Sequence, residues 1–407
     1  MMCYNAIRYI IIVIGIIIFG SLFCYVFFGT QQNNVTEEMT VDYKKTYWNR
    51  NQCPYVMNQT MIDELKSNNI QQSNTNWNLY FPCSYDNISK EVNEMPIVNN
   101  AKYFILENCD LIVAKDELWK QVVLHHGYDK AKTMMPNSYI LYDNNDLKKF
   151  NIEYNSNKIY IMKKNIQRQE GLKITKNKNE IINGYNNAFV IVQELLQDPY
   201  CVSGRKINIR FYILVICKGN DTEVYVYDDG FMYYTKEKFR KNSLEDGPNI
   251  TTGYIERQVY VDNPLTQKDF KVYLDNPNRQ NLSIIEQNIR NQNMKISEIC
   301  FMRINNLLKD VFISFINKLC GSKVNKRFNN SNITFQIFGA DIAINDQLHP
   351  TIMEINKGPD LGAKDERDSM LKHNMVRDSL KLIGASNEQS QNGFINILSI
   401  SNGSVNN

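Results

Sequence analysis

The stretch that most constrains the fold lies near the C-terminal end, at residues 334–356, which read TFQIFGADIAINDQLHPTIMEIN. Its two apolar halves predict the strands of an antiparallel hairpin. Because alternate residues of a strand point to opposite faces, Asp341 lies on one face of the first strand, and Glu354 and Asn356 share a face of the second. The hairpin can bring these three oxygen-bearing side chains together above an apolar core.

Asp341, Glu354 and Asn356 fit either a metal site or a solvated sheet surface. Two carboxylates that approach each other repel unless a positive charge lies between them. Hard divalent cations such as Mg²⁺ prefer oxygen ligands and bridge carboxylates to nucleotide phosphates. The same spacing also fits polar side chains that face solvent, and spacing alone does not separate the two interpretations.

Basic residues on other predicted strands favour the interpretation with metal and phosphate. Lys163 lies in the predicted strand KIYIMKKN, and Lys206 and Arg210 share one face of a strand predicted at 205–219. A phosphate chain needs such charges, although each of these residues alone is also typical of a solvated surface.

The remaining pattern predicts an α+β protein. An apolar strand at 188–196 contains IVQELL, whose backbone could hydrogen-bond a planar base. Residues 222–235 pair with 205–219 as a long antiparallel hairpin. Helical periodicity predicts one helix at about 286–320 and another at 369–384, which Gly384 ends.

Residues 9–28 form an uncharged apolar segment about as long as a bilayer requires, which predicts one transmembrane helix, an uncleaved signal anchor. A cleaved signal peptide is the competing interpretation, but no small-residue cleavage site follows the segment. Arg8 before the span favours a cytoplasmic N-terminus, and therefore a single-pass protein with a lumenal or extracellular body. Asn-x-Ser/Thr sequons agree with this, although an Asn-rich chain also produces them by chance. They include those at Asn34, Asn58, Asn87 and Asn249.

Cysteine content and net charge set further limits. Cys53 and Cys83 flank a polar region and could pair in a lumenal body. Four more of the nine cysteines lie in apolar surroundings, which predicts buried free thiols. These four are Cys201, Cys217, Cys300 and Cys320. The net charge is only +3 with basic and acidic residues interleaved, so no nucleic-acid partner is expected.

Changes in composition and in apolar periodicity along the chain predict five segments. Polar composition follows the apolar span, and sustained apolar periodicity begins at about residue 100. The segments are a short tail at 1–8, the transmembrane helix at 9–28, a polar stalk with a small ordered appendage at 29–99, a globular domain at 100–385 and a flexible tail at 386–407.

Taken in order, these motifs resemble the tubulin-tyrosine-ligase-like branch of the ATP-grasp superfamily, over roughly residues 100–384. The motifs are Lys163, VQELLQDP, GRKINIRFYILV and FQIFGADIAINDQLHPTIMEIN. The resemblance implies an ATP-grasp fold, with mixed and antiparallel sheets and flanking helices, here preceded by the transmembrane helix. It also implies ATP and Mg²⁺ as cofactors.

The resemblance implies a role for each matching residue. Lys163 would bind the nucleotide phosphates, and Gly171 would lie in the mobile loop that covers them. Lys206 and Arg210 would bind phosphate and act in catalysis. The adenine hinge would consist of Gln193, Glu194, Leu195 and Leu196. The magnesium ligands would be Asp341, Glu354 and Asn356.

Three departures from the family's pattern bear on the acceptor. Asn208 stands where the family has aspartate, Asp228 and Asp229 replace its Arg-Glu pair, and Thr252 replaces an asparagine. The family's arginine helps to hold an acidic protein substrate, so aspartate in its place should repel an acidic tail. Nucleotide chemistry is therefore expected to be retained, whereas tubulin is a doubtful acceptor.

The resulting hypothesis is a membrane-anchored, ATP- and Mg²⁺-dependent carboxylate–amine ligase. It would add an amino acid to a protein or another acceptor through an acyl phosphate. Two alternatives stay open: a nucleotide-binding pseudoenzyme that acts as a membrane scaffold, and an ATP-grasp phosphotransferase. The first would bind ATP without turnover, and the second would add a phosphate in place of an amino acid.

Overall fold

A computed structural model describes most of the chain after residue 45, and Thr46–Asn407 form one compact unit. The predicted transmembrane helix at 9–28 lies outside the described residues. Within the described part, no helix is both long and apolar enough to cross a bilayer. The described residues are 46–50, 53, 56–83, 87–166, 171–321, 326–386, 390–401 and 404–406.

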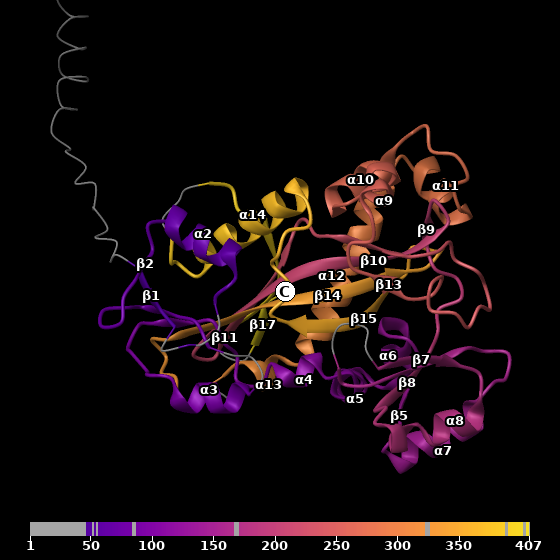
Figure 1. Cartoon of the computed structure of the whole chain (residues 1–407), viewed down its shortest axis with the longest axis horizontal. Coiled ribbons are helices and arrows are strands. Elements are labelled where there is room, and N and C mark those ends of the chain that lie inside the picture. The colour runs from indigo at the N-terminus through magenta and orange to yellow at the C-terminus, as the bar shows by residue number, and fades with distance from the viewer. Residues whose placement is uncertain are drawn as a thin grey trace, which may run out of the picture. The chain divides into compact units, whose positions relative to one another are not determined.

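Two long antiparallel strands form the centre of the fold (Figure 1). Strand β10 (Arg205–Lys218) pairs with β14 (Ile333–Ile344) along nearly its whole length, and both are buried almost throughout. Strand β15 (Pro350–Lys357) pairs with the other edge of β14, with Asp341 opposite Glu354. The predicted hairpin and its register are therefore confirmed.

The second predicted hairpin is confirmed only in its first half. Strand β11 (Asp221–Tyr227) pairs with β10 after the turn at Gly219, but β12 (Met232–Thr235) is a separate strand that pairs with Ile207–Ile209. Gly230 lies between them, and a Cβ there would be 2.0 Å from the carbonyl oxygen of Arg210. Only glycine allows this close crossing, which is why the run at 222–235 is not continuous.

Three short strands among the described residues 46–99 belong to the same sheet, which differs from the predicted stalk and small appendage at 29–99. Together with β4, which follows residue 100, they continue the sheet beyond β14 in the order β4, β3, β1, β2. Buried aromatic residues such as Trp77 and Tyr80 fix this edge, with ring centroids 5.4 Å apart. The strands are β1 (Tyr47–Asn49), β2 (Gln71–Gln72), β3 (Leu79–Tyr80) and β4 (Lys102–Tyr103).

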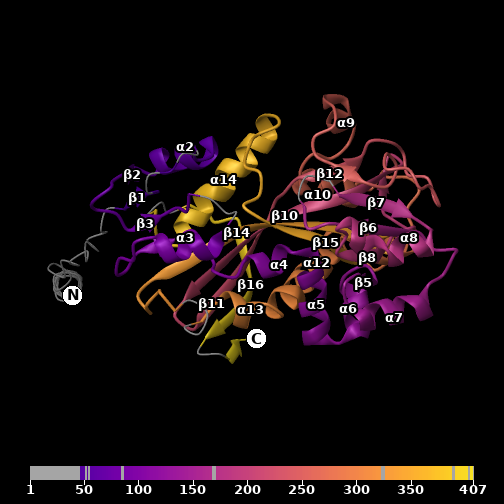
Figure 2. The same ribbon diagram turned by 60° about the horizontal axis from the view of Figure 1, so that its bottom comes forward.

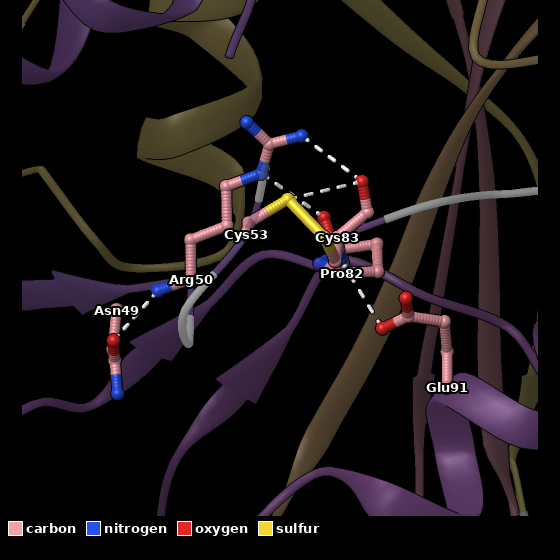
Figure 3. Close-up of a disulfide and its surroundings, with 6 residues drawn as sticks. All are labelled: Asn49, Arg50, Cys53, Pro82, Cys83 and Glu91. Carbon is pink, nitrogen blue, oxygen red and sulfur yellow. Dashed lines mark hydrogen bonds between the residues drawn. A yellow bond between two sulfur atoms is a disulfide. The ribbon is translucent and has the colours of Figure 1, made fainter. Parts of the chain in front are cut away.

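A disulfide joins Cys53 to Cys83, a pairing that the sequence left open (Figure 3). Arg50 reinforces the link, because its guanidinium donates to the carbonyls of Pro82 at 3.2 Å and Cys83 at 3.1 Å. Glu91 accepts a hydrogen bond from the backbone N–H of Cys83 at 3.2 Å. These contacts attach the segment that contains Arg50 and Cys53 to the residues that follow β3.

Three corrections concern the C-terminal half. The expected flexible tail at 386–407 contains strand β16 (Phe394–Ser401), which pairs with β11 because its alternate residues Phe394, Leu398 and Ile400 are buried. The helix expected at 286–320 is interrupted, and Asn293 at the break has a φ of 56°. Cys217 and Cys320 form a second disulfide instead of being free thiols. The segments are α11 (Ile284–Asn291), α12 (Ile296–Ile313), α13 (Ile316–Leu319) and a final short strand, β17 (Ser404–Asn406).

A second, four-stranded sheet has the order β5, β8, β6, β7. It contains both the predicted strand at 158–165 and the apolar strand at 188–196, and helices α7 and α8 lie beside it (Figures 1 and 2). Its members are β5 (Ser138–Ile140), β6 (Tyr160–Lys163), β7 (Leu172–Thr175), β8 (Ile191–Glu194), α7 (Asn144–Glu153) and α8 (Lys178–Ile182). The protein is thus α+β with two sheets.

Helices cover the edges and faces of both sheets. The last long helix, α14 (Glu366–Leu382), confirms the prediction at 369–384, and Gly384 follows it with a φ of 65°. The other helices are α2 (Gln59–Ser67), α3 (Ile88–Glu94), α4 (Asp110–Val113), α5 (Lys115–His126), α6 (Tyr128–Met134), η1 (Gly184–Asn187), α9 (Arg257–Asp262) and α10 (Gln267–Asp275); two short strands, β9 (Cys201–Val202) and β13 (Thr251–Thr252), complete the fold.

Helix α12 packs against the central strands, and this contact gives a test of the core. Phe312 is fully buried, with its ring 5.9 Å from that of Phe338 on β14. We expect Phe312→Ala to lower the free energy of unfolding by about 3–5 kcal/mol, because it leaves a cavity. The control Met302→Ala, at a side chain that is 52% exposed, should change it by less than about 0.5 kcal/mol. Urea denaturation measures both, and equal effects would contradict this packing.

Candidate functional site

A cavity of about 640 Å³ lies where the four-stranded sheet meets the long strands of the main sheet. Strands β6 and β8 supply one wall, and β10, β14 and β15 supply the other. The segments 249–253 and 358–360 close its sides. Nine of the eleven residues predicted for the site line this cavity, and two do not.

One part of the cavity wall is apolar. Ile161, Leu172, Leu195 and Met353 line it, and they come from both sheets. Gln193 on β8 is 2% exposed, and its amide donates to the hydroxyl of Ser138 at 2.9 Å. The Oε1 of Gln193 has no hydrogen-bond partner. A buried acceptor without a donor, beside an apolar slot, is suited to a planar ring that carries an N–H group.

For three residues that the sequence assigned to nucleotide binding, the structure shows surroundings other than those expected. Leu196 lines a neighbouring cavity and not this one. Glu194 lines this cavity but forms an ion pair with Lys158 at 2.8 Å. Gly171 is not in the cavity wall; it has a φ of 73°, and a Cβ there would lie 2.8 Å from that of Lys164. The positive φ and the close side chain of Lys164 together require glycine at this position.

Lys163 and Lys206 face the cavity from opposite sheets. Burial lowers the pKa of Lys163 to about 8, although Glu354 acts in the opposite direction. Burial likewise lowers the pKa of Lys206 to about 8. The ammonium of Lys163 donates to the carbonyl of Met353 at 3.4 Å, and that of Lys206 to the carbonyl of Asn249 at 3.1 Å. Two partly satisfied buried ammonium groups are suited to bind an anion.

The sequence-based site set omitted Lys115, which lines the same cavity. Its side chain is 10% exposed and its Nζ lies 3.9 Å from a carboxylate oxygen of Glu354. Asn165, two residues after the end of β6, accepts a hydrogen bond from the backbone N–H of Lys115 at 3.0 Å. The same Asn165 donates to Asp116 at 2.8 Å, so the start of α5 is attached beside β6. The Lys-Asp pair at the helix start was the available signal.

The acidic end of the cavity contains the predicted oxygen ligands. Arg210 binds Asp341 with two hydrogen bonds, Nε to Oδ1 at 2.6 Å and Nη2 to Oδ2 at 3.0 Å. Burial raises the pKa of Asp341 to about 6, and Arg210 opposes this shift. Burial would also raise the pKa of Glu354, but Lys115 and Lys163 hold it below its usual value. The amide of Asn356 donates to Glu354 at 3.2 Å.

The residues at this end fit a hard divalent cation. Asp341, Glu354 and Asn356 bring two carboxylates and one amide together on adjacent strands. Among the described residues there is no group of three or more His, Cys, Asp and Glu side chains that could hold a metal alone. A magnesium ion would therefore need oxygen atoms of a bound phosphate chain as well. The lysines that surround the same cavity suit such a chain.

Of the four residues that depart from the family pattern, two line the cavity and two do not. Asn208 and Thr252 both line the cavity, and the buried Oδ1 of Asn208 has no hydrogen-bond partner. Asp228 and Asp229 do not line it. The ammonium of Lys268 lies 3.7 Å from Asp228 and 3.9 Å from Asp229, and Lys271 donates to the carbonyl of Asp228 at 3.0 Å. The two aspartates are thus locally compensated, which removes the basis for predicting that they repel an acidic substrate.

Comparisons with known proteins show which family this chain resembles. A family model described as the tubulin-tyrosine ligase family matches residues 93–392. A probable beta-tubulin polyglutamylase of Tetrahymena thermophila is 28% identical over 200 residues, which cover 47% of this chain and 16% of that protein. The probable tubulin polyglutamylase TTLL9 of Bos taurus is 26% identical over 193 residues, covering 47% and 38% respectively. For the tubulin polyglutamylase TTLL7 of Homo sapiens the identity is 22% over 202 residues, covering 48% and 22%. The matched stretch spans well under half of each relative.

The lowered pKa of Lys206 gives a test that needs no substrate. A lysine whose pKa is about 8 when folded and 10.5 when unfolded holds more protons in the unfolded state between these values. Stability of the ligand-free protein should therefore rise with pH from about 8 to 10. Lys206→Met should reduce this slope by up to about 1.4 kcal/mol per pH unit. Lys236→Met, at an exposed lysine, is the control. Urea unfolding at several pH values measures the slopes, and an unchanged slope in Lys206→Met would contradict the buried ammonium.

Proposed function

The chain belongs to the tubulin-tyrosine ligase family, and from that premise we propose that it is an ATP- and Mg²⁺-dependent ligase. It would join the carboxylate of a protein acceptor to the amine of an added amino acid. The observation that carries the proposal is a single cavity with an apolar slot at one end, lysines in the middle and paired carboxylates at the other end. This order matches a base, a phosphate chain and a metal.

Each part of the cavity would have one task. The slot around Gln193 would hold the adenine, and Lys115, Lys163 and Lys206 would bind the phosphates. Asp341, Glu354 and Asn356 would hold Mg²⁺, which supplies charge neutralisation at the transferred phosphoryl group when it is bound. Catalysis of this kind depends on positioning and electrostatics and uses no nucleophilic side chain.

The proposed reaction has two covalent steps. An oxygen of the acceptor carboxylate attacks the γ-phosphorus of ATP, the bond to the bridging oxygen breaks, and ADP leaves. The amine nitrogen then attacks the acyl carbon, the carbon–oxygen bond to phosphate breaks, and inorganic phosphate leaves while the nitrogen loses a proton to solvent. Arg210 would keep Asp341 in place during both steps through its two hydrogen bonds.

An acidic protein segment is the acceptor that we propose. The relatives are named as tubulin polyglutamylases, which suggests tubulin as one such protein. The expectation that Asp228 and Asp229 make tubulin a doubtful acceptor is not supported, because both lie outside the cavity and next to Lys268. Tubulin would reach the site only from the cytosol, so the lumenal or extracellular body proposed below would require another acidic protein as the acceptor.

Glu354 gives a direct test of the proposal. Wild-type protein should gain stability from MgATP, about 2.7 kcal/mol at a concentration 100 times the dissociation constant. Glu354→Gln should lose most of that gain and at least about 100-fold in amide formation, because it removes a metal-binding charge. Glu298→Gln, at a glutamate whose side chain is 66% exposed, should behave like wild type.

The products distinguish the alternatives. Mass spectrometry of the acceptor separates the addition of an amino acid from the addition of a phosphate, which would indicate a phosphotransferase. Stabilisation by MgATP without any adduct would indicate a nucleotide-binding scaffold. No stabilisation by MgATP, or equal stabilisation of wild type and Glu354→Gln, would contradict the nucleotide site itself.

We also propose that residues 9–28 anchor the protein and that its body lies in an oxidising lumen or outside the cell. Two disulfides within the described residues support this compartment, because such bonds persist where thiols are oxidised. Two of the sequons differ in exposure. Asn87 is exposed, whereas Asn249 is 2% exposed and donates to the carbonyls of Ser243 and Glu245.

Glycosylation tests the compartment. Ser89→Ala removes the sequon of exposed Asn87 without removing the Asn87 side chain that caps α3. It should reduce by one glycan the mass lost on peptide-N-glycosidase treatment of protein made in its own cell. Thr251→Ala removes the sequon of buried Asn249 and should change nothing. A wild-type protein that loses no mass at all would contradict the lumenal body.

A further inference from the structure

A second cavity, of about 290 Å³, adjoins the first. Its wall is mainly apolar, and besides two buried prolines it has four large apolar side chains that are 8% exposed or less. Its volume is close to the lower limit of roughly 300–1,000 Å³ for small-molecule sites, so it can hold one large apolar side chain and not an extended ligand. The four buried residues are Met61 from α2, Phe81 after β3, Phe104 after β4 and Ile337 from β14.

The two cavities share one wall. Gly358, Pro359 and Asp360, directly after β15, line both of them. Along β15 the chain passes from Met353 at the apolar slot, through Glu354 and Asn356, to this shared wall. The second cavity therefore lies beyond the carboxylates and on the side away from the slot.

The spacing of residues along β14 also places the second cavity beyond the carboxylates. Ile337, Gly339 and Asp341 are alternate residues of one strand, so their side chains share a face. Ile337 and Asp341 are four positions apart along the strand, which corresponds to about 13 Å at roughly 3.3 Å per residue. An extended peptide with a carboxylate at Asp341 would bring a residue about four positions away to the second cavity.

The outer wall of this cavity comes from a part of the chain that the family match does not include. Arg50, Met57, Met61 and Phe81 precede residue 93, where the match begins. The disulfide and the two hydrogen bonds of Arg50 hold this part beside Pro82 (Figure 3). The hydroxyl of Thr60 on α2 also donates to the carbonyl of Leu361 at 3.0 Å, which attaches α2 to the shared wall.

We propose that this second cavity binds a large apolar side chain of the acceptor, about four residues from the carboxylate that is modified. The inference rests on the proposed ligase function, because it assigns the carboxylate to the neighbouring site. The occupant is an acidic peptide segment with a Leu, Met or Phe anchor. The wall that both cavities share connects this cavity with the carboxylate site, and its mainly apolar lining suits an apolar side chain better than a second phosphate or a sugar.

Peptide selection tests the proposal without turnover. The full chain, with Mg²⁺ and a non-hydrolysable ATP analogue, is incubated with nine-residue peptides that carry one glutamate at the fifth position and are random elsewhere. Mass spectrometry then identifies the retained peptides. Burial of one apolar side chain should enrich Leu, Met or Phe near either end of the retained peptides by about 10-fold.

Two neighbouring residues provide matched variants. Met57→Trp fills the rim of the cavity and should abolish the enrichment, whereas Val56→Trp, at a side chain that is 87% exposed, should leave it unchanged. Met57→Glu serves as a second variant, because a charge at the rim rejects an apolar anchor. All three should keep the stabilisation by MgATP, which shows that they fold.

The outcomes separate this proposal from the ligase function. Absence of apolar enrichment in wild type, or enrichment that survives both Met57 variants, would overturn the anchor site. Enrichment that Met57→Trp removes supports it, even where the retained peptides are never modified, in which case the ligase proposal fails. Modification of peptides with no preference for an apolar residue overturns the anchor site and leaves the ligase proposal intact.

Discussion

The paired hydrogen bonds between Arg210 and Asp341 are the interaction on which the rest of the site depends. Both side chains are buried, and they join the two longest strands at the register where Arg210 lies opposite Asp341. Removal of one partner would leave an unpaired buried charge, which typically costs about 3–5 kcal/mol. The neighbouring Gly339 is part of this arrangement, since a Cβ there would lie 3.0 Å from the guanidinium of Arg210. The pair thus fixes strand register and places an acidic residue at the edge of the cavity at once.

Around that pair, the ligand-free site holds groups in unfavourable states. Burial displaces the pKa values of Lys163, Lys206 and Asp341 toward their neutral forms, in each case at a cost in folding stability near neutral pH. Gln193 and Asn208 add buried oxygen atoms without donors. A bound anion and cation would relieve the charged groups together, because the lysines gain a negative partner and the carboxylates a positive one. The free energy that these buried groups cost the folded protein would therefore be recovered on binding and would contribute to the binding free energy.

The sequence predicted the features that depend on neighbouring residues and missed those that depend on residues far away in the chain. Period-two spacing within one hairpin was enough to place Asp341 opposite Glu354, since register follows from a local turn. The break at Gly230 was missed because its cause, the backbone of Arg210, is distant in sequence and adjacent in space. Strand β16 was missed for a similar reason, since its partner β11 lies more than 160 residues earlier. Cys217 and Cys320 each resemble a buried free thiol, and only the packing of α13 beside β10 brings their sulfur atoms together. Lys115 and Leu196 differ from expectation by the direction of a side chain, which no spacing rule fixes.

The division of the chain between the two cavities follows from these same constraints. Residues that would hold nucleotide and metal extend from Lys115 to Asp360, all inside the family match, and they require the register of β10, β14 and β15. The outer wall of the second cavity comes from the segment around Arg50 and Met57, which one disulfide and the contacts of Arg50 attach beside Pro82. Changes in this segment leave the strand register intact, so its side chains can vary without disturbing the phosphate site. If the second cavity binds the acceptor as proposed, its outer wall could change the preferred acceptor while the residues between the two sheets stay the same.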